Sequence, residues 1–141
     1  MIVLDTTAVS ALMQPRLNPT AIAWLDRQQL TQMHMTTITV MEIWAGIERL
    51  PASARRRRLE TAFDSIVHDT LRGRILEFDF DAAMAAAVLM AARLRAGRPI
   101  DVRDTQIAGI AVSRSAAIAT RNTRHFADLS VDVIDPWDAP A

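Results

Sequence analysis

The chain opens with Met1-Ile2-Val3-Leu4-Asp5-Thr6-Thr7, a short apolar run rich in β-branched residues that ends on polar ones. Such a run predicts a buried parallel strand, and an Asp or Thr directly after it is a typical cap for a following helix. The same succession of strand and helix continues to the other end of the chain. The sequence therefore predicts a three-layer α/β/α sandwich around a mainly parallel, five-stranded sheet.

Apolar periodicity, together with Pro, Gly and capping residues, sets the expected boundaries of the elements. Strands are expected at 1–4, 34–38, 75–78, 117–120 and 131–134. Helices are expected after Asp5, from 19 to about 30, from Thr39 to 50, from 55 to about 69, from Asp81 to about 96, and over 102–113. No repeat or long linker interrupts the pattern, so residues 1–141 are expected to form one domain.

The composition excludes several classes of enzyme. Cysteine is absent, which rules out disulfides, thiolate zinc sites and Cys nucleophiles. All 16 of the Lys and Arg residues are arginine, so P-loop NTPases, Schiff-base enzymes and phospho-acceptor receiver domains, which use a lysine, are also excluded. The formal net charge is +0, and any contact with nucleic acid must therefore be local.

Neither a membrane span nor a signal peptide is expected. The longest apolar run, 82–92, is mostly alanine and well short of the roughly 20 residues that cross a bilayer. The first residues lack the basic start and the small-residue cleavage site of a secretory signal. We expect a cytoplasmic protein that does not bind membranes.

Three carboxylates occupy positions where parallel sheets bind ligands, beyond the carboxyl ends of the strands. Asp5 follows the first strand, Glu42 is expected in the first turn of the helix after the second strand, and Asp104 stands near the start of the helix before the fourth. Asp5 and Glu42 could also serve only as a cap and as a helix-dipole partner. Asp104 exceeds what capping requires, because Asp101 already caps that helix.

Four short motifs follow one another along the chain in a characteristic order. They are Ile2-Val3-Leu4-Asp5-Thr6, Thr39-Val40-Met41-Glu42, Pro99-Ile100-Asp101-Val102-Arg103-Asp104-Thr105-Gln106-Ile107-Ala108, and Ala119-Thr120-Arg121-Asn122-Thr123-Arg124-His125-Phe126 with Asp135-Pro136-Trp137. Together they resemble the motifs of PIN-domain ribonucleases, and most closely those of VapC and FitB-like toxins of toxin–antitoxin modules. The resemblance covers essentially the whole chain.

The resemblance implies a metal-dependent endoribonuclease with Asp5, Glu42 and Asp104 in its acidic cluster. A fourth family position, often acidic, falls on Asn122, whose amide oxygen can still bind a metal or a coordinated water. Family members commonly carry Asp where His125 stands, so we expect His125 to be a surface or locally bonded residue without a catalytic role.

A cluster of carboxylates favours a hard cation. At an effective dielectric constant of about 20, two carboxylates about 5 Å apart repel by roughly 3 kcal/mol. Oxygen donors without cysteine point to Mg²⁺ or Mn²⁺, which would activate a water to hydrolyse a phosphodiester bond. Asp5 and Asp104 are the expected primary ligands, while Glu42 supports a ligand or orients the water. The hydroxyls of Thr6 and Thr120 are expected to support them by hydrogen bonds.

The resemblance also implies an RNA substrate, an antitoxin partner and a homodimer. Arg121 and Arg124 are the arginines expected to hold the RNA backbone, whereas the run 55–58 is expected to be a solvated face or an antitoxin contact. Residues expected in an apolar groove for the antitoxin are Trp24, Met41 and Trp44. Residues expected on one close-packing helix face, in the core or at a dimer interface, are Ala83, Ala86, Ala87 and Met90.

Two alternatives accompany this interpretation. A PIN-like module that binds nucleic acid or protein without catalysis would keep the fold, although the presence of all three acids argues against it. A haloacid-dehalogenase-like phosphatase also places an Asp after its first strand. That class needs a second Asp where Thr7 stands, and it needs a lysine.

Overall fold

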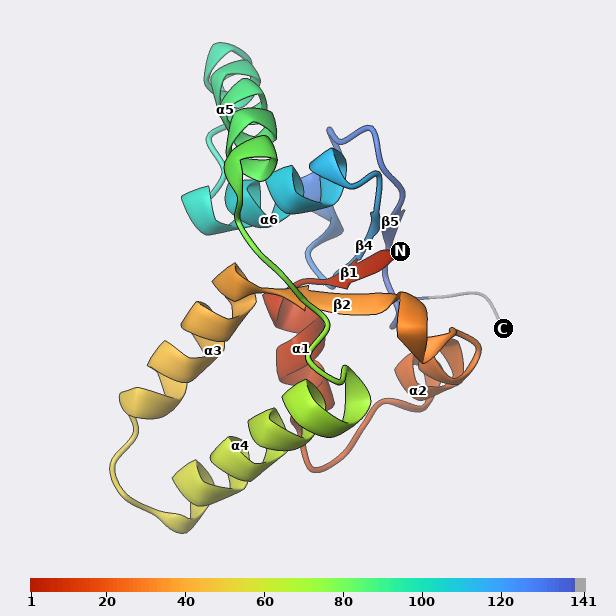
Figure 1. Cartoon of the computed structure of the whole chain (residues 1–141), viewed down its shortest axis with the longest axis vertical. Coiled ribbons are helices and arrows are strands. Elements are labelled where there is room, and N and C mark those ends of the chain that lie inside the picture. The colour runs from red at the N-terminus through yellow and green to blue at the C-terminus, as the bar shows by residue number, and fades with distance from the viewer. Residues whose placement is uncertain (139–141) are drawn as a thin grey trace.

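Five short strands form a single, wholly parallel sheet in the computed structural model, which describes residues 1–138 (Figure 1). The strand order is β3-β2-β1-β4-β5, with all four neighbouring pairs parallel. The strands are β1 (Ile2–Leu4), β2 (Met33–Thr36), β3 (Ile75–Leu76), β4 (Ala117–Ala119) and β5 (Val133–Ile134). The first and fourth strands of the chain are therefore neighbours at the centre of the sheet.

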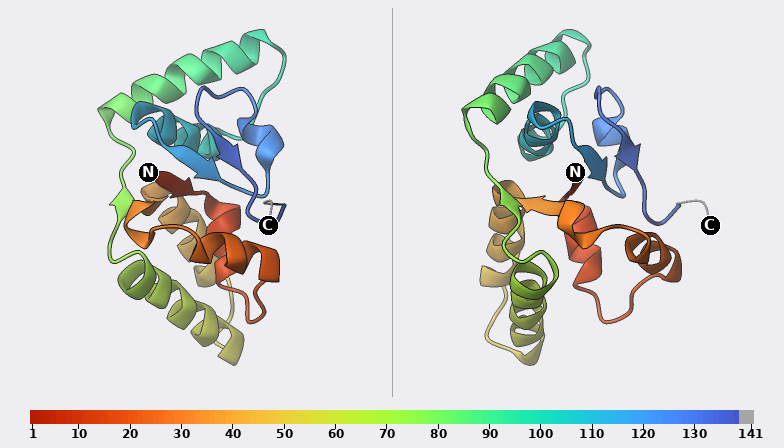
Figure 2. Two further views of the ribbon diagram at one scale, coloured as in Figure 1. Left: turned by 90° about the vertical axis from the view of Figure 1, so that its right-hand side faces the viewer. Right: turned by 45° about the vertical axis from the view of Figure 1, so that its right-hand side comes forward.

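Six helices cover the two faces of this sheet. They are α1 (Thr6–Leu12), α2 (Pro19–Asp26), α3 (Thr37–Glu48), α4 (Ala54–Ser65), α5 (Phe80–Arg95) and α6 (Val102–Ser113). Three shorter turns are η1 (Leu30–Gln32), the π-helical η2 (Ile66–Thr70) and η3 (Thr123–Phe126). Figures 1 and 2 show α1–α4 on one side of the sheet and α5 and α6 on the other. The expected three-layer fold is confirmed.

Successive strand residues point to opposite faces and so belong to two separate cores. Leu4 and Ala119 lie in the core beneath α1–α4, whereas Val3 and Ile118 lie in the core beneath α5, α6 and η3. Trp24 is only 6% exposed and belongs to the first of these cores. Trp24 is therefore a core residue and not a main part of an exposed groove, which corrects the expectation for this residue.

Small residues bring α5 and α6 into close contact. Ala82 and Ala86 are buried against α6, where Gly109 leaves no room for a side chain. A Cβ atom on Gly109 would lie 2.5 Å from the Ala82 carbonyl oxygen and 2.8 Å from the Ala86 Cβ. Of the expected small-residue face, Ala86 is thus in the core, while Ala87 is exposed.

Two helices begin earlier than expected, because an earlier residue acts as the cap. The Thr36 hydroxyl accepts a hydrogen bond from the backbone N–H of Thr39, so β2 ends at Thr36 and α3 starts at once. Asp79, rather than Asp81, caps α5 by accepting from the Ala82 N–H. Where several Thr or Asp residues are close in sequence, composition alone does not identify the cap.

Other boundaries differ by a few residues. The β3, β4 and β5 strands are shorter than expected, and α2 ends at Asp26 because a separate turn, η1, precedes β2. Within residues 1–138, no helix is long and apolar enough to cross a membrane.

The α5–α6 contact yields a stability prediction. Gly109→Ala should lower the free energy of unfolding by about 1–3 kcal/mol, because the added methyl group overpacks a backbone contact. Gly46→Ala is the matched control: it also lies in a helix, but no atom lies within 4 Å of its added Cβ. That substitution should stabilise α3 by up to about 1 kcal/mol. Urea unfolding measures both, and equal effects would contradict the packing described.

Candidate active site

The candidate acids lie on elements that meet near the carboxyl ends of the central strands. The chain runs from β1 into α1 on one face of the sheet, whereas α6, on the other face, leads into the adjacent strand β4. The chain connections thus switch from one face of the sheet to the other between β1 and β4. The carboxyl ends of two such strands are the usual place for a ligand site in an open parallel sheet. Figure 1 shows β1 and β2 running in the same direction toward this edge.

Asp5 is the most buried acid of the site, with 1% of its surface exposed. Its Oδ1 accepts hydrogen bonds from the Ala8 N–H at 2.9 Å and the Thr7 hydroxyl at 2.7 Å. Its Oδ2 accepts from the Thr120 hydroxyl at 2.5 Å, across from β4. Burial raises the pKa of the Asp5 carboxyl, while these hydrogen bonds oppose the rise. Asp5 thus caps α1 and also joins the two central strands.

Glu42 lies on α3 and faces α1. The Thr6 hydroxyl donates to Glu42 Oε1 at 2.8 Å and also lies 3.0 Å from the Thr39 hydroxyl. On the other oxygen, Arg103 Nη1 is 3.6 Å from Glu42 Oε2. The sequence predicts Glu42 in the first turn of its helix. Because α3 begins at Thr37, Glu42 instead lies in the second turn.

Asp104 lies in the first turn of α6, which Asp101 caps by accepting from the Arg103 N–H. The Asp104 Oδ2 is hydrogen-bonded to His125 Nδ1 at 2.7 Å. His125 is partly exposed, as expected, but its hydrogen-bond partner is a distant residue and a candidate metal ligand. Their 21-residue separation, across a strand, gives no periodic signal that could have revealed the pair.

Asn122 and Thr120 follow β4 directly. Thr120 is fully buried, and its hydroxyl both donates to Asp5 and accepts from the Asn122 backbone N–H at 2.9 Å. The Asn122 residue itself is exposed at the start of η3. Asn122 is therefore tied to the site through its backbone.

The carboxylate oxygens of Asp5, Glu42 and Asp104 are of the kind that a hard divalent cation binds. Their side chains are not arranged as a chelating cluster. Among residues 1–138, no three His, Asp or Glu side chains are arranged as metal ligands. The charge of Asp104 nevertheless contributes to the raised pKa of Asp5, so these two carboxylates lie within electrostatic reach of each other. Carboxylate oxygens are the ligands that Mg²⁺ prefers. The oxygen donors at this edge of the sheet are therefore of the kind that a Mg²⁺ ion binds.

One arginine contacts a candidate acid, and two others follow β4 in the sequence. Arg103 pairs with Glu42 and Asp101, and it was not singled out by the sequence analysis. Arg121 stacks its guanidinium over the Trp137 ring, 4.8 Å from the ring centroid. Arg124 and His125 line a cleft of about 480 Å³ next to the start of α6. Cationic groups thus border the site despite the chain's zero net charge.

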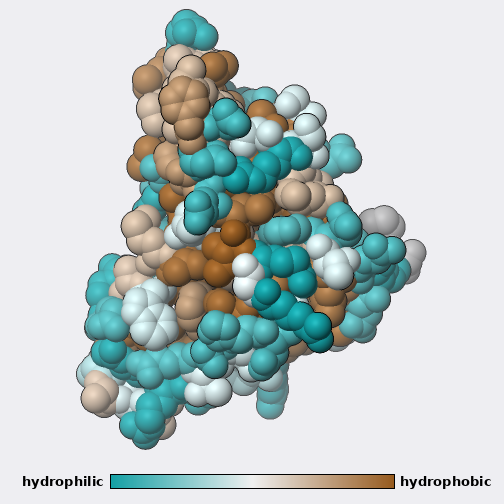
Figure 3. Space-filling view, in the orientation of Figure 1, coloured by the Kyte–Doolittle hydropathy of each residue, from teal (hydrophilic) through white to brown (hydrophobic). Residues whose placement is uncertain are grey.

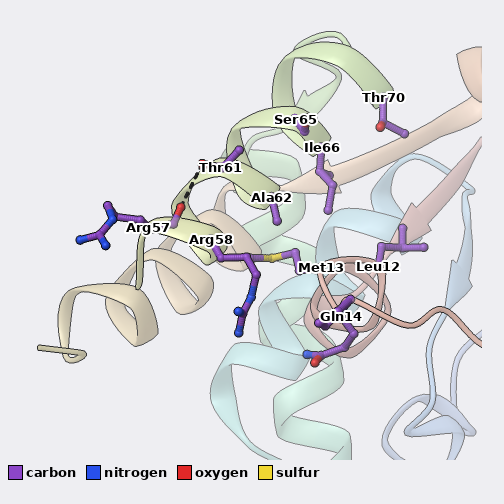
Figure 4. Close-up of a pocket in the computed structure, with 11 residues that line it drawn as sticks. Leu12, Met13, Gln14, Arg57, Arg58, Thr61, Ala62, Ser65, Ile66 and Thr70 are labelled. Atoms are coloured by element: carbon purple, nitrogen blue, oxygen red, sulfur yellow. Dashed lines mark hydrogen bonds between the residues drawn. The ribbon is translucent and has the colours of Figure 1, made fainter. Parts of the chain in front are cut away.

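The largest of the described pockets is separate from the acids. It measures about 620 Å³ and lies between the end of α1 and α4 (Figure 4). Its lining combines apolar side chains such as Met13 and Ile66 with Arg57 and Arg58. None of the candidate acids lines it, so volume does not identify the active site here.

Two of the three residues expected to receive an antitoxin lie at the surface. Met41 and Trp44 are 53% and 39% exposed on α3. The Trp44 ring lies 5.6 Å from the Phe63 ring of α4, centroid to centroid. In the expected basic run, Arg56 pairs with Glu48 and Glu60, whereas Arg57 and Arg58 border the pocket of Figure 4.

Comparison with known proteins agrees with this geometry. The PIN domain family model matches residues 2–131. The chain is 36% identical to VapC ribonuclease Y4jK of Sinorhizobium fredii, covering 98% of this chain and 99% of that protein. It is 32% identical to Toxin FitB of Neisseria gonorrhoeae, over 97% and 99% of the two chains. A structure of FitAB bound to an IR36 DNA fragment superposes with a TM-score of 0.88 at 31% identity, covering 100% of this chain and 99% of that one.

The burial of Asp5 predicts a specific pH dependence. Its pKa is raised above 3.8, so its contribution to stability is present below pH 3.8 and is lost as pH rises through the folded-state pKa. Asp5→Asn remains neutral, and its free energy of unfolding relative to wild type should therefore increase with pH across that window. Urea unfolding in EDTA at a series of pH values measures the difference.

Asp79→Asn provides the control for that experiment. The Ala82 N–H lowers the pKa of the exposed Asp79 cap, so its contribution is present above pH 3.8 and is lost as pH falls. The Asp79 variant should therefore show the opposite trend. A difference for Asp5→Asn that does not change with pH would contradict the desolvation of Asp5.

Proposed function

The chain belongs to the PIN domain family, and we propose on this basis that it is the toxin of a type II toxin–antitoxin module that cleaves RNA as an endoribonuclease. The proposal is supported by Asp5 directly after β1 and Asp104 in the first turn of α6, in a chain that matches VapC and FitB relatives over nearly its whole length. The reaction is hydrolysis of a phosphodiester bond.

The proposed cofactor is Mg²⁺ or Mn²⁺, held by Asp5 and Asp104 with support from Glu42. When bound, such an ion polarises a phosphate oxygen and lowers the pKa of a water. Thr120 and Thr7 hold the Asp5 carboxylate in one orientation through their hydroxyl groups. A rigid carboxylate of this kind reduces the reorganisation needed when charge develops on the phosphate.

Glu42 is the residue proposed to orient the attacking water. Its Oε1 is held by the Thr6 hydroxyl, while Oε2 lies at a looser 3.6 Å from Arg103. Oε2 can accept a hydrogen bond from a water, and the Arg103 guanidinium beside it is a group that can bind a phosphate oxygen. Asn122 is proposed to assist through its amide oxygen.

The RNA backbone is proposed to contact Arg121 and Arg124. The stacking of Arg121 on Trp137 restricts the guanidinium before RNA arrives, so less side-chain entropy is lost on binding. The backbone N–H of Arg121 also donates to the Thr7 hydroxyl, next to Asp5. The backbone of Arg121 is thus tied to the residue next to Asp5.

The proposed protein partners are an antitoxin and a second copy of the chain. Solved structures similar to this chain include FitAB bound to a DNA fragment and DNA-bound VapBC from Salmonella typhimurium. Figure 3 shows apolar side chains along α5, at the top of the view. Exposed apolar residues of α5 are Phe80, Met84, Val88 and Leu94. This stripe supports a homodimer interface, and a cytoplasmic location is proposed for the complex.

The second candidate is a PIN-like module that binds without catalysis. It is favoured by the arrangement in which Glu42 pairs with Arg103 and Asp104 pairs with His125, with no three acids gathered among residues 1–138. The RNA-cleavage experiment below separates the two candidates.

Inducible expression in a bacterium tests the proposed toxin. Wild type should arrest growth, and Asp5→Ala should not, because the substitution removes a proposed metal ligand.

Purified wild type should cleave RNA only with Mn²⁺ or Mg²⁺, and Asp5→Ala should lower the rate by at least about 100-fold. Asp132→Ala, an exposed acid before β5, is the control and should behave as wild type. Equal toxicity of wild type and Asp5→Ala would refute the nuclease.

RNA binding tests the role of Arg121. In an Asp104→Asn background, where cleavage is blocked, Arg121→Ala should weaken RNA binding and reduce the salt dependence by about one phosphate contact. The Mn²⁺ affinity, measured without the Asp104 substitution, should stay unchanged. Arg95→Ala, an exposed arginine of α5, is the matched control. An unchanged salt slope for Arg121→Ala would exclude it as a phosphate contact.

A further inference from the structure

Arg93, in the last turn of α5, is the most buried arginine among the described residues, with 3% of its surface exposed. A buried cation destabilises a fold unless it is paired and hydrogen-bonded. Its Nε and Nη2 donate to the two oxygens of Asp128, each at 2.9 Å. Nη1 donates to the Thr105 hydroxyl at 2.8 Å, and Nη2 also donates to the His125 carbonyl at 2.7 Å. The guanidinium thus makes four hydrogen bonds.

These hydrogen bonds reach both sides of the His125–Asp104 contact. Thr105 follows Asp104 directly on α6, and its hydroxyl also donates to the Asp101 carbonyl at 3.2 Å. On the other side, the guanidinium holds the backbone of His125 itself. The guanidinium therefore fixes the separation between α6 and η3, across which His125 Nδ1 meets Asp104 Oδ2 at 2.7 Å.

Arg93 is itself fixed by the end of its helix. The Arg98 N–H donates to the Arg93 carbonyl at 2.9 Å, and the Gly97 N–H donates to the Leu94 carbonyl at 3.1 Å. This pair of bonds is a Schellman motif, which Gly97 permits by adopting a φ of 67°. A cation in the last helical turn is also favoured by the helix dipole. Both ends of the Arg93 side chain are thus held.

We propose that Arg93 is a positioning residue, whose guanidinium sets the His125–Asp104 contact and thereby orients the Asp104 carboxylate toward Asp5. The inference rests on the proposed role of Asp104 as a metal ligand. Residues that orient a ligand in this way typically change metal affinity by about 10–100-fold when they are replaced. Arg93 contacts neither the proposed metal nor the RNA, and it acts through Asp104.

The planar shape of the guanidinium, and not only its charge, is required. Asp128 is bound through two parallel N–H groups, while the remaining donors point to Thr105 and to the His125 carbonyl. A lysine ammonium carries its donors on a single nitrogen and cannot span these three partners. Arg93→Lys keeps the charge but should lose the positioning, which separates this role from simple charge pairing with Asp128.

Two measurements on the purified full-length protein test the proposal. The first is the Mn²⁺ dissociation constant, from the electron paramagnetic resonance signal of free Mn²⁺. The second is the ¹⁵N chemical shift of the His125 imidazole in metal-free protein, with His68 as an internal reference. Arg93→Met and Arg93→Lys should each raise the dissociation constant by about 10-fold or more and should move the His125 shifts only. Arg95→Met, two residues along α5, should change neither.

Each outcome supports or overturns the inference. If Arg93→Lys restores both wild-type values, charge alone suffices and the inference is wrong. If the Arg93 variants do not fold, Thr105→Val removes one acceptor of the guanidinium, and unchanged values in that variant overturn it. If wild type binds no Mn²⁺, the proposed metal site fails, and the metal-free His125 shifts still decide whether Arg93 positions the contact with Asp104.

Discussion

The structure depends on one buried carboxylate at the centre of the sheet. Asp5 accepts hydrogen bonds from α1 and from Thr120, so it fixes the first helix and joins the ends of two strands that are far apart in sequence. Without these partners, burial of this charge would destabilise the fold by several kcal/mol. The same requirement explains why small hydroxyl side chains surround it. A site residue is thus also the point at which the sheet and α1 are assembled.

The surrounding acids are stabilised by different means, according to their exposure. Glu42 and Asp104 are only partly buried, and each has a basic side chain beside it: Arg103 and His125 respectively. Because all the long cationic side chains are arginines, each can bridge several acceptors at once. Arg103 joins two acids in this way at the surface. Acidic and basic side chains in this protein are thus paired with one another locally, and the net charge of the chain is zero.

The sequence predicts the order of strands and helices well, because burial of short parallel strands demands continuous apolar runs such as 1–4. It also predicts the places of Asp5, directly after a strand, and of Asp104, near the start of a helix, and the structure confirms both places. It does not reveal the contact between His125 and Asp104, or the burial of Arg93. Those depend on how α5, α6 and η3 pack, and no local periodicity encodes the packing of distant elements. The observed starts of α3 and α5 differ from the predicted ones, because several neighbouring residues could each cap the helix.

The division of the molecule into two cores has a consequence for synthesis of the chain. Glu42 stands on a helix of the first core, Asp104 stands on a helix of the second, and Asp5 needs Thr120, which is 115 residues away. A chain emerging from the ribosome can fold α1–α4 early, but it cannot complete the acidic edge until β4 has been made. The acidic edge therefore cannot form until the chain has been made as far as Thr120, and a product that stops earlier lacks the hydroxyl partner of Asp5.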